Sequence, residues 1–205
     1  FAFNTVGLLR GHPQQTPTIS DLQAFGMQLH WLGYAGYRAR HAADFWLPWQ
    51  AQYPHFYTLP EGGGGLSGAL GCMCLVQQVR EQLPALGWDD YDAWWLAAGT
   101  GTTLAGLLLG EEAAHPVHAA LAVPADHGVE QQVQAIVQAA GRTVGRYHLH
   151  EACRGGFARV DDALLAFMQV CEAASGIALE PLYTAKALMA LRQQVEAGYF
   201  ARGSR

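Results

Sequence analysis

Residues 97–110, Ala-Ala-Gly-Thr-Gly-Thr-Thr-Leu-Ala-Gly-Leu-Leu-Leu-Gly, decide the fold of this chain. The apolar residues 94–98 predict a buried strand, residues 99–102 a tight turn, and residues 103–109 the start of a helix. Glycines let a backbone approach a ligand closely, and the first N–H groups of a helix have no partner within the helix. Because a helix N-terminus also carries a partial positive charge, this turn predicts a site for a phosphate group.

The side chains of the predicted phosphate site are neutral. Thr100, Thr102 and Thr103 add hydroxyl groups to the turn. The turn lacks the Lys-[Ser/Thr] ending of a nucleoside-triphosphate loop and the Gly-x-Gly-x-x-Gly spacing of a dinucleotide fold. The sequence therefore favours a phosphorylated ligand held without magnesium-assisted phosphoryl transfer. The alternative is a glycine-rich turn that serves only close packing.

Three further segments accompany this turn. They are Asn-Thr-Val-Gly-Leu-Leu-Arg-Gly at 4–11, Leu-Pro-Glu-Gly-Gly-Gly-Gly at 59–65 and Glu-Pro-Leu-Tyr-Thr-Ala-Lys at 180–186. In this order and spacing the chain resembles the pyridoxal-phosphate enzymes that include D-cysteine desulfhydrase and 1-aminocyclopropane-1-carboxylate deaminase. The resemblance implies an α/β three-layer sandwich with mostly parallel sheets, of the tryptophan synthase β-like kind (fold type II), and pyridoxal 5'-phosphate as the cofactor.

The resemblance also implies a set of site residues. Thr100 to Thr103 would hold the cofactor's phosphate, and its ring would lie near Tyr183 and Thr184. A threonine facing the ring nitrogen suits a neutral nitrogen and favours elimination. Tyr183 would be catalytic, as a proton donor, although a half-buried tyrosine with a satisfied hydroxyl is the commoner case. The implied cofactor-binding residues are Glu61, Gly62, Gly63, Gly99, Thr100, Gly101, Thr102, Thr103 and Thr184.

The chain departs from the family pattern at two places. Lys186 is its only lysine and matches the helix after the tyrosine, not the position that forms an imine with the cofactor. At about 100° per residue, Lys186 and Thr184 would point roughly 160° apart. Phe157 stands where the family usually has a tyrosine, so the role of that phenol is lost. We therefore expect a central fragment of a longer protein that is catalytically dead on its own.

The resemblance implies a lyase or deaminase that acts on a small amino acid and releases ammonia and a 2-oxo acid. Two alternatives stay open at this point. One is a non-catalytic protein of the same fold that binds pyridoxal phosphate or another small molecule. The other is an amino-acid racemase, which would use the same cofactor.

Composition limits the kinds of binding partner and the cellular compartment that we expect for this chain. The chain is 51% hydrophobic and 14% charged, which indicates a globular protein with a large core. Its net charge of −5 argues against the basic surface that nucleic-acid binding requires. The longest apolar run is broken by threonines and glycines, so no membrane span is expected. The four cysteines are expected to be reduced and mostly buried, as in a cytoplasmic protein. A small amino-acid substrate and a homodimer are the expected partners.

Strands alternate with helices along the chain, which predicts α/β layers around a mostly parallel sheet. We expect a smaller-lobe remnant at 1–53 and a larger cofactor-binding lobe at 54–205, with a connection at 46–54. Strands are predicted at 5–10, 28–32, 56–59, 94–98 and 118–123. Helices are predicted at 19–25, 34–45, 66–83, 103–109, 129–139, 161–174 and 184–197.

Histidines and carboxylates give a weaker signal. His148 and His150 would share one face of a strand, and His115 and His118 one face of a turn. With Glu151 they could bind a metal, but no complete ligand set of known spacing occurs, so we expect no metal site. The acidic pairs expected to be solvated charges at helix ends are at 89–90, 111–112 and 161–162.

Overall fold

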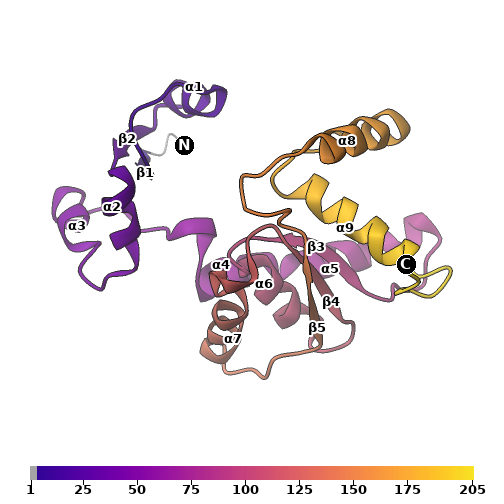
Figure 1. Ribbon diagram of the computed structural model, residues 1–205. Coiled ribbons are helices and arrows are strands. Elements are labelled where there is room, and N and C mark those ends of the chain that lie inside the picture. Colours follow the sequence, from indigo (N-terminus) through magenta and orange to yellow (C-terminus); the bar gives the residue numbers. More distant parts are fainter. Residues whose placement is uncertain (1–3) are drawn as a thin grey trace. The chain divides into compact units, whose positions relative to one another are not determined.

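The computed structural model describes residues 4–205. The chain divides into two compact units, Phe1–Thr58 and Leu59–Arg205 (Figure 1). The sequence predicted a boundary between residues 53 and 54. That the two units are the two lobes of one enzyme stays a prediction. Among the described residues, no helix has both the length and the apolar character needed to cross a bilayer.

The first unit is built around two short parallel strands, β1 (Val6–Leu9) and β2 (Gln28–Trp31). Helix α1 (Pro17–Ala24) connects them and is capped by the Thr16 hydroxyl, which accepts the N–H of Ile19 at 3.2 Å. The other helical segments of this unit are α2 (Gly33–Arg38), η1 (Ala39–His41) and α3 (Leu47–Gln52).

Helix α3 corrects the prediction of a connection at residues 46–54. The stretch is helical from Leu47, and Pro48 is compatible with this because it lies in the first turn, where its missing N–H would have no partner in any case. Residues 56–59, predicted as a strand, are irregular and join neither of the two sheets formed by the described residues. An extended segment becomes a strand only when a neighbour pairs with it.

The second unit contains the sheet that positions the candidate site. Its strands β3 (Trp94–Ala98), β4 (Val117–Leu121) and β5 (Tyr147–Glu151) pair in the order β3-β4-β5, all parallel. The crossovers contain α6 (Thr102–Glu111) and α7 (Val129–Ala139). The remaining helical segments are η2 (Glu61–Gly63), α4 (Leu66–Cys72), α5 (Cys74–Gln82), η3 (Leu83–Leu86), η4 (Ala125–His127), α8 (Asp162–Ser175) and α9 (Thr184–Glu196).

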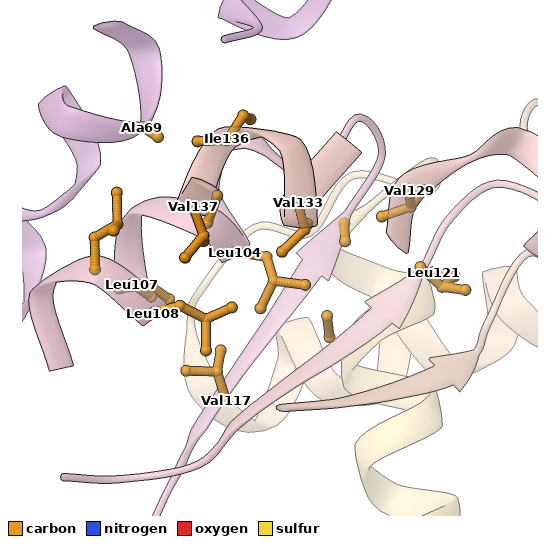
Figure 2. Packing of buried hydrophobic residues seen from close by; sticks show 14 of the residues in the cluster. Ala69, Leu104, Leu107, Leu108, Val117, Leu121, Val129, Val133, Ile136 and Val137 are labelled. Atoms are coloured by element: carbon orange, nitrogen blue, oxygen red, sulfur yellow. The ribbon is translucent and has the colours of Figure 1, made fainter. Parts of the chain in front are cut away.

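Helices cover both faces of this sheet, as predicted for a layered α/β fold. Helix α9 lies against one face, while α4, α6 and α7 lie on the other (Figure 1). The main core lies between the sheet and α6–α7 (Figure 2). Helix α6 is central to it, since Leu104 is fully buried and Leu107 nearly so. The smaller core under α9 consists of alanines that pack with Trp95, namely Ala97, Ala120, Ala152, Ala187 and Ala190.

The predicted helix at 66–83 is two helices that break at Met73. Glycines explain the break, because α4 contains Gly68 and Gly71, which weaken a helix interior. A glycine of α6, Gly106, allows the close contact of α4 with α6. A Cβ at Gly106 of α6 would lie 2.5 Å from the carbonyl oxygen of Ala69 and 2.5 Å from Cβ of Cys72.

This close contact predicts a stability difference between two glycine-to-alanine variants. Gly106→Ala should lower the free energy of unfolding by about 1–3 kcal/mol, because the added methyl group forces α4 and α6 apart. Gly71→Ala is the matched control: a Cβ there meets no atom within 4 Å, so stability should hold or rise by up to about 1 kcal/mol. Urea denaturation followed by circular dichroism measures both. Equal stability of the two variants would contradict the packing.

Candidate functional site

The threonine loop, residues 99–103, leaves the carboxyl end of β3 and enters α6. Gly101 is the residue before the helix and has φ of 84°, a conformation that glycine adopts without strain. A side chain there would also collide with Val133, since a Cβ would lie 2.7 Å from its Cγ2. The turn therefore requires glycine, and α6 begins directly after it at Thr102.

The three threonines of this loop differ in exposure. Thr102 is buried, Thr100 is partly buried, and Thr103 is exposed. The hydroxyl oxygens of Thr100 and Thr102 are 3.2 Å apart and share a hydrogen bond. Thr103 lies in the first turn of the helix and faces solvent. A phosphate at this point would meet N–H groups, hydroxyls and no opposing carboxylate from the loop itself.

A second glycine-rich turn packs directly on the threonine loop. Gly62 and Gly63 have φ of 65° and 64°. A Cβ on Gly62 would overlap the side chain of Thr100, and a Cβ on Gly68 would overlap the carbonyl oxygen of Gly63. The two turns approach this closely only because Gly62 has no side chain, and Gly68 in the same way lets α4 pack on the turn before it.

Tyr183 joins the same group of residues. Its ring lies against Gly99, where a Cβ would come within 2.9 Å of Cε1. Burial raises the pKa of Tyr183, and the charges of Glu61 and Glu180 raise it further. The phenol is therefore protonated at neutral pH and can act as a proton donor. The structure brings Glu61, Gly62, Gly99, Thr100 and Tyr183 together, and their role in binding a cofactor stays a prediction.

Glu180 orients the start of α9. Its carboxylate accepts the backbone N–H groups of Leu182 at 2.8 Å and Tyr183 at 2.6 Å, and also that of Thr184. Burial alone would raise the pKa of Glu180, but these hydrogen bonds outweigh it and lower the pKa. The Thr184 hydroxyl accepts the N–H of Glu180 at 3.0 Å. Both residues expected beside a cofactor ring are thus held by one carboxylate.

Helix geometry predicted that Lys186 and Thr184 point apart, and Lys186 binds the loop after β5 while the Thr184 hydroxyl contacts the backbone of Glu180. Its ammonium group is buried and donates to the carbonyl oxygens of Cys153, Gly156 and Phe157 at 3.1, 3.1 and 2.7 Å. Sequence reasoning did not find these partners, because backbone carbonyls carry no residue signature. The Phe157 ring contacts the Tyr183 ring edge-on, with centroids 5.3 Å apart.

The histidines form other groups than predicted, because His118 joins His148 and His150 and not His115. His148 and His150 share a strand face, and both contact His118. His118 Nδ1 is 3.0 Å from His150 Nε2. His115 does not join them, because it precedes β4 and binds Glu111 and Asp90 instead. Within residues 4–205 no cluster of three or more histidines, cysteines or carboxylates has the geometry of a metal site.

Glu111 contradicts the expectation of a solvated helix-end charge. Its side chain is fully buried and receives hydrogen bonds from Arg80 at 3.0 Å, Trp94 at 2.6 Å and Tyr91. Burial alone would raise the pKa of Glu111, but these donors lower it.

The free cysteines also differ from the expectation that they are mostly buried, since only Cys153 is buried.

The site residues fit a phosphorylated aromatic cofactor. The threonine loop offers N–H and hydroxyl donors, and the absence of Cβ atoms at Gly62 and Gly99 lets Thr100 and Tyr183 pack against these glycines. Tyr183 offers a half-exposed aromatic ring. These groups would meet the phosphate and the ring without a metal ion.

Comparison with known proteins supports the same family. No family model matches the chain. A protein of Pyrococcus furiosus described as "Putative 1-aminocyclopropane-1-carboxylate deaminase" is 24% identical over 151 residues, covering 69% of this chain and 46% of the relative. A protein of Pyrococcus horikoshii with the same description is 27% identical over 144 residues, covering 66% and 43%. The chain therefore spans less than half the length of these curated relatives.

Solved structures show the fold. The crystal structure of an ACC deaminase homologue matches with a TM-score of 0.79 at 20% identity, covering 97% of this chain and 63% of that one. A hydrogen sulfide-producing enzyme from Fusobacterium nucleatum matches with a TM-score of 0.58 at 14% identity, covering 95% and 65%.

The class of the protein follows from these findings: the chain has the α/β fold of pyridoxal-phosphate enzymes of fold type II. Its resemblance to the aminocyclopropane-carboxylate deaminase and D-cysteine desulfhydrase family is confirmed. Pyridoxal phosphate is the cofactor of that family.

The histidine cluster predicts a pH dependence of stability. Burial, with the neighbouring His148 and His150, lowers the pKa of His118 to about 4. Because an unfolded histidine has a pKa of about 6.5, the folded state loses stability as the pH falls below that value, by about 2 kcal/mol from pH 7 to pH 5. Denaturation at a series of pH values measures the loss. His118→Gln should flatten the profile, and an unchanged profile would contradict the assignment.

Proposed function

We propose that this chain is the cofactor-binding part of a pyridoxal-phosphate-dependent lyase or deaminase that acts on a small amino acid and yields ammonia and a 2-oxo acid. The observation that carries the proposal is the convergence of two glycine-rich turns and a protonated tyrosine at the carboxyl end of β3. In parallel α/β sheets, ligands bind at the carboxyl ends of the strands.

The cofactor would be held by the two turns and the start of α9. In this proposal the N–H groups at the start of α6, with Thr100 and Thr103, bind the phosphate, and Gly62 and Gly63 line the approach. Tyr183 and Thr184 lie beside the ring. When bound, pyridoxal phosphate withdraws electrons from the α-carbon of an amino acid, which makes loss of a proton or a β-substituent possible.

Tyr183 would move a proton in this reaction. Its raised pKa keeps the hydroxyl protonated at neutral pH, so it can donate to a leaving group or a carbanion but is a poor base. Glu180 fixes the backbone on which Tyr183 lies. Phe157 has no hydroxyl, so Tyr183 would be the single phenol in this part of the site. We therefore favour elimination from a small amino acid over opening of a cyclopropane ring.

The imine-forming amine must come from a lysine other than Lys186. A lysine ammonium has three N–H donors, and three carbonyl oxygens accept them here. The same observation favours the second candidate, a non-catalytic protein that binds pyridoxal phosphate.

A homodimer and a cytoplasmic location remain predictions.

Substitution of Thr103 tests the phosphate site. Thr103→Glu should weaken pyridoxal phosphate binding more than tenfold, because a carboxylate at the start of α6 repels the phosphate and takes its place on the helix N-terminus. Calorimetric titration measures the affinity. Thr143→Glu is the matched control, since Thr143 is exposed and outside the two turns. Equal affinities of the two variants would count against the site.

Borohydride reduction tests the chemistry of Lys186. After incubation of the 205-residue chain with pyridoxal phosphate and reduction, mass spectrometry should find no stoichiometric label on Lys186, and D- and L-amino acids should not be turned over. The reason is that an amine donating three hydrogen bonds cannot attack an aldehyde. Stoichiometric labelling of Lys186 together with turnover would overturn the proposal. Turnover of D- or L-amino acids by a protein with another imine-forming lysine would separate the enzyme from the binding protein.

A further inference from the structure

Lys186 and Glu111 are both deeply buried charged side chains. Only 1% of the surface of Lys186 is exposed. Its three partners are carbonyl oxygens of one loop, which follows β5 and extends from Cys153 to Phe157. A buried cation is costly unless it is fully hydrogen-bonded, and the three acceptors match the three N–H donors of an ammonium group.

The loop that Lys186 binds has an unusual backbone. Arg154, Gly155 and Gly156 have φ of 53°, 81° and 152°, so three consecutive residues lie at positive φ. This path turns the carbonyls of Cys153, Gly156 and Phe157 towards one point. Repulsion among three converging carbonyl oxygens disfavours such a loop by itself, and a cation at their centre offsets it. Burial lowers the pKa of Lys186, and the nearby carboxylates of Glu180 and Asp161 act in the opposite direction.

The side chain at the end of this loop belongs to the candidate site. Phe157 gives Lys186 its shortest hydrogen bond, 2.7 Å to the carbonyl oxygen, and its ring contacts Tyr183 edge-on. Tyr183 directly precedes α9, three residues before Lys186. The two rings are 36% and 37% exposed, so they present a shared aromatic surface to solvent. An aromatic pair of this kind suits the side of a flat heteroaromatic ring.

We propose that Lys186 is a positioning residue, whose ammonium group fixes the 153–157 loop so that Phe157 and Tyr183 together form an aromatic wall for the ring of the ligand. This inference rests on the proposed function for the nature of the ligand. Lys186 acts through Phe157 and does not touch the reacting atoms. The wall selects for an aromatic ring on the phosphate, whereas the threonine loop binds the phosphate itself.

The test separates ring binding from phosphate binding. Affinities for pyridoxal phosphate and for inorganic phosphate are measured by titration for the wild type, Lys186→Met, Phe157→Ala and the double variant. Lys186→Met keeps an unbranched side chain, one atom shorter, that donates no hydrogen bond. We expect each single variant to bind pyridoxal phosphate about five- to tenfold more weakly, with phosphate affinity unchanged.

The double variant shows whether the two residues act as a unit. If Lys186 works through Phe157, Lys186→Met adds no further loss in the Phe157→Ala background. Phe157→Tyr should retain the wild-type affinity, because it keeps the ring. Val170→Ala, at an exposed apolar residue of α8, is the matched control and should also bind as the wild type does.

Hydrogen–deuterium exchange gives a readout that needs no ligand. Residues 153–157 should exchange faster in Lys186→Met than in the wild type, while β3 and α6 should not change. If the wild type does not bind pyridoxal phosphate, the proposed function fails, and the exchange result still decides the positioning role. If Lys186→Met does not fold, Lys186→Gln, which keeps two N–H donors, takes its place. Wild-type affinity and exchange in the folded variant, or failure of both variants to fold, would overturn the inference.

Discussion

Close backbone contact at the carboxyl end of β3 is the constraint on which the candidate site depends. Gly62 lies against Thr100, and Gly99 lies against Tyr183, at separations that no side chain on either glycine would allow. Three segments far apart in the sequence therefore meet at one point. The same principle applies between two helices, where Gly106 lets α6 pack closely against α4. Glycine is thus needed here for its size, and at Gly101 for its positive φ as well.

The site has an unusual charge balance for one that would hold a phosphate. The threonine loop contributes hydroxyl and N–H groups and no cationic side chain. Binding would then depend on the oriented N–H groups at the start of α6, which are fixed by the packing of that helix in the core. A rigid, buried α6 matters more to such a site than a flexible lysine would. This links the burial of Leu104 and Leu107 to the proposed function.

The sequence predicted the central elements well and the polar interactions poorly. Strand β3 and helix α7 have the predicted bounds, because a short apolar run and a 3.6-residue period are strong local signals. Glu111 was misread because its burial depends on Arg80, 31 residues away, and on Tyr91 and Trp94. Residues 56–59 are apolar enough for a strand, but pairing depends on a partner that local sequence does not reveal.

Helix α9 shows how one element can serve two sides of a site. Glu180 holds Tyr183, which precedes the helix, and Thr184, its first residue, near the two glycine-rich turns. Ala187 and Ala190 pack on the sheet. Lys186 leaves the helix in another direction and binds the loop after β5. An ammonium group that donates all three hydrogens has no lone pair with which to attack an aldehyde carbon. Imine formation and the positioning of Phe157 therefore require two different amines.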